Sequence, residues 1–348
     1  MSAWADARPY GFFGTQKPLK VAVTGGAGYI GSHTVAELVS LGHHVTVIDD
    51  FSAGHHAAVP GGVAVVQGDI GDLVSMSRAL RGQEAVIHFA GLLSVSGSMR
   101  DPRSYFETNF VKGLGLLDAM QAAGVSRLVF SSTCATYGVP RGPLNEDHPK
   151  EPVNPYGASK RSFEQALEAY ARIGQLRAVA LRYFNAAGAR RDGSLGEDHA
   201  PEEHLIPLAL DAAALRRAPL TIFGDDYGTE DGTCIRDYIH VDDLARAHVR
   251  ALDRLDALED PFAAINLGTG RGTSVREVIR AVERVSGTPV PHAVGPRREG
   301  DPPRLVAVPD RARALLGFEP SITSIDEIVE TAWRWRKAHP AGYSTEAS

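Results

Sequence analysis

The sequence predicts an α/β protein, built on a doubly wound parallel sheet with a smaller C-terminal α/β lobe. Three observations predict this fold class. Short apolar runs suited to buried strands alternate with longer segments of helical period. A glycine-rich turn directly follows the first of these runs. After Asn185 the composition and the spacing of the expected elements change. Gly, Asp, Glu and Pro dominate through Pro201, and the later elements are irregularly spaced.

The first strand is expected at residues 20–24, and regular alternation continues from there. Residues 86–90, Val-Ile-His-Phe-Ala, form a nearly continuous apolar run, which is typical of a strand covered on both faces. The other expected strands are 45–48, 63–66, 85–89, 128–131 and 178–183, and the expected helices are 30–41, 105–123 and 156–173.

The chain is expected to divide into three parts. Residues 1–19 form an N-terminal extension, 20–190 the main sheet domain and 191–345 the smaller lobe that binds substrate. The boundary between the main sheet domain and the smaller lobe does not fall at one point in the sequence. A helix at 242–255 and a strand at 264–267 are expected to bring the segment near 236–268 back to the first sheet.

Composition excludes several classes of protein. The 348 residues are 43% hydrophobic and 22% charged, and no run approaches the ~20 apolar residues of a membrane span. The net charge of −6 provides no broad basic field, so we expect no nucleic-acid partner. Two cysteines, Cys134 and Cys234, cannot build a disulfide framework, and the start of the chain does not read as a signal peptide, so a reducing cytoplasm is expected.

Residues 24–31 read Thr-Gly-Gly-Ala-Gly-Tyr-Ile-Gly and lie between the first expected strand and helix. Gly25, Gly28 and Gly31 have the spacing of a dinucleotide-binding turn, where the backbone approaches a pyrophosphate at the start of a helix. Asp49 ends the second strand at about the 20-residue distance expected for a carboxylate that holds the adenosine ribose. That carboxylate would repel a 2′-phosphate. The sequence therefore predicts a Rossmann-type domain that binds NAD rather than NADP.

Tyr156 and Lys160 lie four residues apart on one face of a helix expected to begin just after Asn154 and Pro155. Taken alone, such a pair is more often part of an exposed helix face. Downstream of a dinucleotide turn it indicates catalysis. A nearby ammonium and a positively charged nicotinamide can lower the pKa of a tyrosine hydroxyl, which then acts as a base.

With these motifs the chain resembles the extended short-chain dehydrogenases/reductases. The resemblance implies that Thr133, which ends the strand segment Ser131-Ser132-Thr133, hydrogen-bonds the reacting oxygen. Members that dehydrate nucleotide sugars carry an Asp-Glu pair next, because elimination needs an additional acid and base. Here Cys134 and Ala135 follow, and the Glu typical of the related decarboxylases is missing too. With dehydration and decarboxylation disfavoured, the remaining reaction is reversible oxidation at one carbon.

From about Val21 to Tyr343 the chain resembles the UDP-glucose 4-epimerases in particular. The resemblance implies an NAD-dependent isomerase that interconverts UDP-galactose and UDP-glucose through a transient 4-keto sugar. It also implies a homodimer, with the helices near 105–123 and 156–173 as candidates for the contact. The segments that carry it are 23–34, 88–91, 181–185, 232–241 and 297–301.

The resemblance implies residues for each part of the site. The catalytic residues are Tyr156, Lys160 and Thr133. The residues implied to bind the cofactor are Gly25, Gly28, Tyr29, Ile30, Gly31, Asp49, Asp69, Ile70, Phe89, Ala90, Lys160 and Tyr183. The residues implied to bind the UDP-sugar are Thr133, Tyr156, Asn185, Leu205, Thr221, Phe223, Arg236, Arg298 and Asp301. Two guanidinium groups can clamp a diphosphate, and an aromatic ring offers a face to uracil.

Some positions depart from the family pattern. The loop 92–98 lacks the usual Val-Gly-Glu-Ser, and Leu93 stands where some members carry a lysine that contacts the cofactor. Thr108 occupies a position where asparagine is common, although Asn109 follows. Leu305 stands where a bulky Tyr or a smaller Cys helps decide whether N-acetylated sugars fit. The preferred UDP-sugar therefore stays open.

Two alternative functions are weighed. One is 4-epimerisation of another UDP-sugar, an N-acetylhexosamine or a pentose. The other is a non-catalytic NAD-binding regulator, against which the retention of Thr133, Tyr156 and Lys160 argues. No metal site is predicted. The adjacent pairs at 43–44 and 55–56 are expected to be solvent-exposed histidines, because neighbouring residues do not face one ligand.

Overall fold

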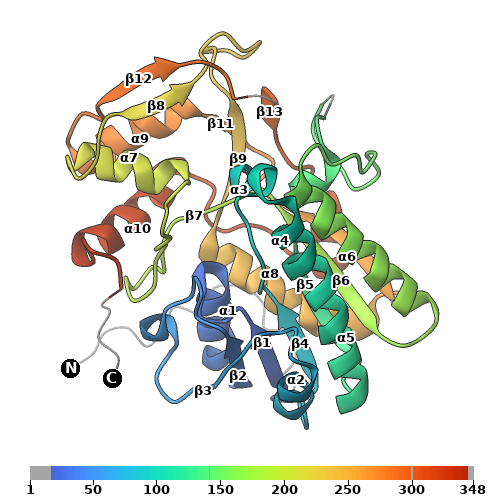
Figure 1. Cartoon of the computed structure of the whole chain (residues 1–348). Coiled ribbons are helices and arrows are strands. Elements are labelled where there is room, and N and C mark those ends of the chain that lie inside the picture. The colour runs from blue at the N-terminus through green and yellow to red at the C-terminus, as the bar shows by residue number, and fades with distance from the viewer. Residues whose placement is uncertain (1–16, 141, 299–300, 344–348) are drawn as a thin grey trace.

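The structure, a computed structural model, describes residues 17–140, 142–298 and 301–343. Most of the predicted extension 1–19, and the end of the predicted lobe at 344–345, lie outside these residues. A seven-stranded sheet with parallel pairing throughout has the order β10-β6-β5-β4-β1-β2-β3 (Figure 1). Its strands are β1 (Lys20–Thr24), β2 (His44–Asp49), β3 (Ala64–Gln67), β4 (Ala85–His88), β5 (Arg127–Thr133), β6 (Arg177–Tyr183) and β10 (Phe262–Leu267).

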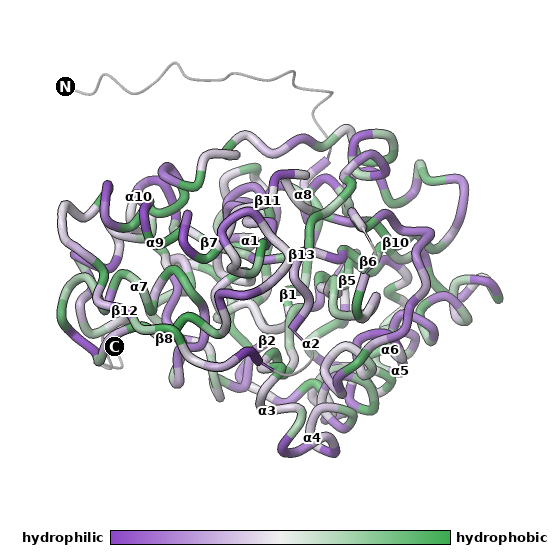
Figure 2. The backbone as a smooth tube through the Cα atoms, turned by 90° about the horizontal axis from the view of Figure 1, so that it is seen from above, coloured by the Kyte–Doolittle hydropathy of each residue, from purple (hydrophilic) through white to green (hydrophobic). Residues whose placement is uncertain are grey.

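Helices cover both faces of this sheet, as the alternating apolar runs predict. Successive side chains of a strand point to opposite faces, so Val21 and Val23 enter one core while Ala22 enters the other. The first core includes α1 (Tyr29–Ser40) and α8 (Val241–Arg254), and the second includes α2 (Leu73–Ala79), α5 (Lys112–Ala123) and α6 (Pro155–Arg172). Figure 2 shows the central strands largely in green, with purple segments toward the outside. The predicted fold class is confirmed.

The predicted helical stretch 105–123 is confirmed as helical throughout, but it is not one regular α-helix. The chain instead forms α3 (Val95–Arg100), α4 (Pro102–Phe106), a π turn η2 (Glu107–Val111) and then α5. The extra residue of the π turn accompanies the burial of Asn109, whose amide donates to the Leu92 carbonyl at 3.0 Å and accepts from the Leu92 N–H at 2.8 Å. Hydrophobic periodicity in the sequence cannot reveal the π turn, because the turn accompanies hydrogen bonds to Leu92, which lies outside the helix.

The later part of the chain builds two smaller sheets beside the large one. Strand β9 (Ile235–His240) pairs with β7 (Asn185–Ala187), β11 (Gly272–Ser274) and β13 (Arg304–Leu305). Strand β8 (Leu220–Phe223) pairs with β12 (His292–Gly295), and the helices α7 (Leu205–Ala213), α9 (Val275–Ser286) and α10 (Ile325–Ala338) form a separate core with them (Figure 1). Short turns complete the described chain: η1 (His56–Ala58), η3 (Cys134–Tyr137), η4 (Leu255–Ala257) and η5 (Ala312–Leu316).

Two predictions for the later segments are confirmed. The predicted helix at 242–255 is α8, and the predicted strand at 264–267 is β10, which pairs with β6 at the edge of the large sheet. A third observation concerns membranes. Among the helices that the structure describes, none combines the length and the apolar character needed to cross a bilayer.

A buried charge network holds α6 against the large sheet. Arg182 of β6 donates two hydrogen bonds, of 2.8 and 2.6 Å, to the two carboxylate oxygens of Glu164 on α6. Ser132 of β5 donates to the same carboxylate at 2.6 Å, and Arg182 also donates to the Tyr137 hydroxyl at 2.9 Å. The Tyr137 hydroxyl donates in turn to Asn266 of β10 at 2.7 Å. One helix and three strands are therefore tied through buried polar groups.

Removing one charge of this network should destabilise the fold strongly. Arg182→Met would leave the buried Glu164 carboxylate with only the half-buried Arg161 as an ion-pair partner, 3.2 Å away, and we expect a loss of about 3 kcal/mol in the free energy of unfolding. The matched control is Arg172→Met, which removes an exposed ion pair with Glu168 on the same helix and should cost no more than about 1 kcal/mol. Urea unfolding of both variants measures the difference. Equal losses of unfolding free energy in Arg182→Met and Arg172→Met would contradict the stabilising role of the buried network.

Candidate active site

The glycine-rich turn lies between β1 and α1, where the chain passes very close to two neighbours. Gly25 has a φ of 70°, and a Cβ there would lie 2.5 Å from the backbone nitrogen of Ala90, just after β4. A Cβ at Gly31 would overlap the Gly25 carbonyl oxygen. Both glycines are therefore required by close approach of backbone to backbone, as the spacing predicts.

The start of α1 is open toward a ligand. Gly28 is the N-cap residue, and within the described chain no side chain caps the helix and no acidic residue lies in its first turn. A Cβ at Gly28 would meet only the Gly25 oxygen, at 3.4 Å, so there is space beside this turn. The Tyr29 hydroxyl is directed away, donating to the Gly188 carbonyl at 2.7 Å. The free N–H groups and the helix dipole suit a pyrophosphate.

Asp49 lies at the end of β2, next to this turn. Its carboxylate accepts from the backbone N–H groups of Ala27 and Phe51, each at 2.9 Å. Burial raises the pKa of Asp49, and these two hydrogen bonds oppose the increase. The carboxylate is thus held beside the glycine turn, where a ribose hydroxyl could reach it.

Other predicted cofactor residues lie at the ends of the neighbouring strands. Asp69 forms an ion pair with Lys112. Burial raises the pKa of Asp69, but the hydrogen bonds from Lys112 and the Gly71 N–H, together with the charge of Lys112, outweigh it and lower the pKa. Ile70 is buried beside it. Phe89, directly after β4, packs against the ring of His248 with ring centroids 4.6 Å apart.

Tyr156, Lys160 and Thr133 come from two neighbouring elements. Helix α6 begins as predicted, because the Asn154 side chain accepts from the Gly157 N–H at 2.8 Å and Pro155 takes the first helical position. The first turn of α6 carries Tyr156, and Lys160 follows on the same face. Thr133 is the last residue of β5, and its side chain lies close enough to the Tyr156 hydroxyl to lower the pKa of that hydroxyl. The predicted catalytic residues are therefore brought together.

The ammonium group of Lys160 is buried against the end of the sheet. Its Nζ donates to the Ser131 carbonyl at 3.1 Å and lies 4.9 Å from the centre of the Phe130 ring. The Tyr183 hydroxyl is hydrogen-bonded to the Ser131 side chain. Tyr183 and Lys160 thus meet at the same residue of β5, although they come from different elements.

Burial sets the charge state of both candidate catalytic groups. It raises the pKa of the Tyr156 hydroxyl well above its ordinary value, and the nearby Thr133 side chain opposes this only in part. It also lowers the pKa of Lys160 to about 8. The chain alone therefore keeps Tyr156 protonated at neutral pH, and Lys160 remains mostly charged. A further positive charge bound beside the hydroxyl is needed to ionise it.

A second group of predicted residues gathers in the smaller sheets. The guanidinium of Arg298 lies 4.3 Å from the centre of the Phe223 ring, and Asp301 donates its backbone N–H to the Arg298 carbonyl at 3.3 Å. Asp301 also forms an ion pair with Arg236, which is paired in register with Leu305. These four predicted residues and the ambiguous Leu305 therefore form one neighbourhood.

The remaining predicted substrate residues lie on other elements. Asn185 begins β7 and pairs in register with Tyr238 of β9. Thr221 and Phe223 are both exposed on one face of β8, whereas Leu205 is the first residue of α7 and packs against the core of the lobe.

The unusual loop 92–98 makes a contact that the sequence reasoning missed. Ser94 and Ser96 donate to the two carboxylate oxygens of Glu203, at 2.6 and 2.8 Å. Glu203 lies two residues before α7, so this loop is tied to the start of that helix. Charge patterning offers no signal for the contact, since the partners are more than a hundred residues apart in sequence.

Similarity to known proteins shows the family to which this chain belongs. The family model described as NAD dependent epimerase/dehydratase family matches residues 21–268. This chain belongs to that family. A UDP-glucose 4-epimerase of Rhizobium leguminosarum bv. trifolii is 51% identical over 318 residues, which cover 90% of this chain and 96% of the relative.

Solved structures of the epimerase/dehydratase family agree. A crystal structure of UDP-glucose 4-epimerase from Brucella ovis in complex with NAD is 48% identical, with a TM-score of 0.88 over 90% of this chain and 97% of that one. The UDP-glucose 4-epimerase from Bifidobacterium longum in complex with NAD+ and UDP is 37% identical, with a TM-score of 0.88 over 93% of this chain and 100% of that one. The predicted resemblance to the UDP-glucose 4-epimerases is confirmed.

In this member of the epimerase/dehydratase family, the glycine turn can be tested by adding one methyl group. Gly31→Ala would force the start of α1 away from Gly25, and we expect a loss of about 2 kcal/mol in unfolding free energy, together with weaker dinucleotide binding. The control is Gly61→Ala, whose Cβ would meet nothing within 4 Å. Urea unfolding and calorimetric titration with NAD measure the two effects. A Gly31→Ala protein that matches the control in both would refute the close-approach argument.

Proposed function

We propose that this chain is an NAD-dependent UDP-glucose 4-epimerase, which interconverts UDP-galactose and UDP-glucose through a transient 4-keto sugar. The observation that carries the proposal is the placement of Tyr156, Lys160 and Thr133 together, in a chain 51% identical to a UDP-glucose 4-epimerase. The absence of an acid–base pair at Cys134 and Ala135 favours reversible oxidation over dehydration.

NAD is the proposed cofactor. The uncapped start of α1 would take the pyrophosphate, Asp49 the adenosine ribose, and Asp69 and Ile70 would flank the adenine. Ala90 and Phe89 would line the path toward the ring, near Lys160 and Tyr183. Bound NAD supplies a nicotinamide ring that accepts a hydride from the sugar C4′ and returns it. A family described as NAD dependent and a relative solved with NAD support this choice.

Tyr156 is the proposed acid and base. It would take the proton of the 4′-hydroxyl, while Thr133 holds the reacting oxygen by a hydrogen bond. Burial opposes ionisation of Tyr156, so the Lys160 ammonium and the positive charge of the oxidised cofactor must stabilise the phenolate. The keto sugar would turn about its bonds to the diphosphate, and Tyr156 would give the proton back after reduction on the opposite face.

Turning of the sugar requires a firm hold on the nucleotide. Arg236 and Arg298 would bind the diphosphate, Asp301 the uridine ribose, and Phe223, with Thr221 and Leu205, the uracil. Asn185 would contact the hexose region. Anchoring at the non-reacting end leaves the hexose free to present either face.

We further propose a homodimer in a reducing cytoplasm. Phe106, directly before the π turn, and Val111, its last residue, are large apolar side chains with at least a third of their surface exposed, which suits a subunit contact along this helical segment. Cys134 and Cys234 are both free thiols, as expected where thiols stay reduced.

The role of Tyr156 is tested by removing one oxygen atom. Tyr156→Phe should lower kcat for UDP-galactose by about 100-fold or more, because no other group would move the proton, while bound NAD is retained. Tyr170→Phe, on the same helix, is the control and should keep full turnover. Chromatography of UDP-galactose, UDP-N-acetylgalactosamine and a UDP-pentose measures turnover on each sugar. Undiminished activity of Tyr156→Phe would remove it as the base.

The diphosphate clamp is tested on two adjacent arginines. Arg298→Leu should raise KM for UDP-galactose about 10-fold or more, because a charge-assisted hydrogen bond is lost. Arg297→Leu is the control, since Arg297 faces Tyr227 and Asp226 instead. Steady-state kinetics of both variants give the comparison. If Arg297→Leu raises KM as much as Arg298→Leu does, the clamp is wrongly assigned.

A further inference from the structure

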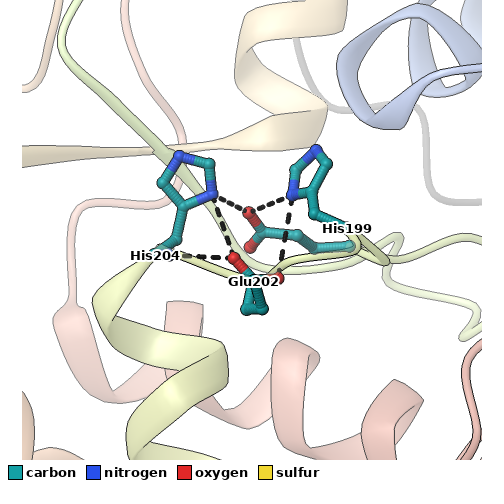
Figure 3. Close-up of side chains that lie close together, drawn as sticks. His199, Glu202 and His204 are labelled. Carbon is teal, nitrogen blue, oxygen red and sulfur yellow. Dashed lines mark hydrogen bonds and ion pairs between the residues drawn. The ribbon is translucent and has the colours of Figure 1, made fainter. Parts of the chain in front are cut away.

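Two histidines and two glutamates converge in the loop that leads into α7. Glu197, His199, Glu202 and His204 each offer one ligand atom, and these four atoms all lie within 4.8 Å of one another. Figure 3 shows the imidazole rings of His199 and His204 turned toward the carboxylate of Glu202. Glu197 is buried, and His199, Glu202 and His204 are half-buried.

The four candidate ligand atoms are close neighbours of one another. The His204 Nδ1 lies 2.6 Å from Glu197 Oε1 and 3.4 Å from Glu202 Oε1, and the His199 Nδ1 lies 3.4 Å from Glu197 Oε1. Yet Glu197 Oε1, Glu202 Oε2 and both Nδ1 atoms are buried and have no well-formed hydrogen bond within the described chain. Buried polar atoms that lack well-formed hydrogen bonds indicate a missing partner, and a metal ion beside them would supply one.

One of the carboxylates is also pre-oriented. The Glu202 Oε1 atom accepts from the backbone N–H groups of Glu203 and His204, both at 2.8 Å. This leaves Glu202 Oε2 directed into the cluster, 3.7 Å from the His199 Nδ1. Backbone donors that fix a carboxylate in this way are typical of the surroundings of a metal ligand.

We propose that Glu197, His199, Glu202 and His204 bind one zinc ion in a closed, structural site. Two imidazole nitrogens and two carboxylate oxygens form a set of four that suits tetrahedral zinc, whereas magnesium and calcium favour oxygen ligands alone. Four protein ligands leave no open position for a substrate, so the ion stabilises structure and takes no part in the reaction. The site is independent of the epimerase proposed above.

The contacts of the loop indicate what the ion would hold together. Asp198 accepts from the backbone N–H of Tyr343 at 2.8 Å, and its carbonyl lies 3.0 Å from the Nε2 of His55. The His199 ring lies edge-on to Tyr29, the first residue of α1, and His204 directly precedes α7. An ion here would fasten the lobe to the helix that begins at the dinucleotide turn.

The histidine pairs at 43–44 and 55–56, which were expected to be solvent-exposed, are exposed only in part. His44 and His56 are exposed as predicted, but His43 and His55 are half-buried, because His43 accepts from the Leu19 N–H and His55 contacts Asp198. The available signal was the spacing Glu-x-His-x-x-Glu-x-His at 197–204, which places four metal-binding side chains in eight residues.

The alternative to a metal is a set of ion pairs. Burial lowers the pKa of His199, but the neighbouring carboxylates of Glu197 and Glu202 together outweigh it and raise that pKa to about 9. Without zinc, protonated imidazoles would therefore pair with the two carboxylates. A direct measurement of bound metal distinguishes the zinc-bound cluster from the metal-free set of ion pairs.

The test uses the full chain, purified without chelator, dialysed against EDTA and then titrated with zinc chloride by calorimetry. We expect about one zinc per chain, and at least a 100-fold loss of affinity in His199→Asn and His204→Asn, because even the loss of a residue that only hydrogen-bonds a metal ligand costs about 10–100-fold. His55→Asn is the matched control: it removes an imidazole that touches the same loop, and it should bind zinc like the unchanged protein.

Three outcomes would overturn the proposal: no zinc uptake by the unchanged chain, equal affinity in His199→Asn, or equal loss in His55→Asn. If the ligand variants fail to fold, cobalt(II) titration of the unchanged chain decides, because a tetrahedral site gives intense visible absorption bands and ion pairs give none. Metal content is measured apart from turnover, so failure of the epimerase proposal would leave this result unaffected.

Discussion

The buried ion pair between Arg182 and Glu164 is the constraint on which the candidate active site depends. It joins α6 to β6, and Ser132 ties the same carboxylate to β5. Tyr156 and Lys160 are carried by that helix, so this contact helps to set their distance from the end of β5. Such a pair adds little net stability compared with apolar packing, but neither charge can be left alone, and the helix therefore has one position.

Burial also determines the chemistry that the chain can perform by itself. The same low-dielectric surroundings that order the site raise the pKa of Tyr156 and lower that of Lys160. A base at Tyr156 is thus created only when positive charge is bound next to it. In the proposed epimerase, cofactor binding and activation of the tyrosine are one event, so a chain without its dinucleotide would have little ability to deprotonate a sugar.

The loops that join the two halves of the molecule form a second organising feature. Glu203 ties the loop before α3 to the start of α7, and the neighbouring cluster from Glu197 to His204 meets Tyr29 at the start of α1. A metal ion at the cluster would make this junction less deformable.

The sequence by itself determined the alternation of strands and helices, the glycine turn, and the placing of Asp49, Thr133 and Tyr156 at element ends, because these follow from local periodicity and fixed spacing. Only the tertiary structure decided the π turn around Asn109, the partner of Arg182, and the convergence in the loop before α7. Each of these depends on groups that meet in space across long separations in the chain, or on the direction in which side chains point, and neither leaves a periodic trace in the order of residues.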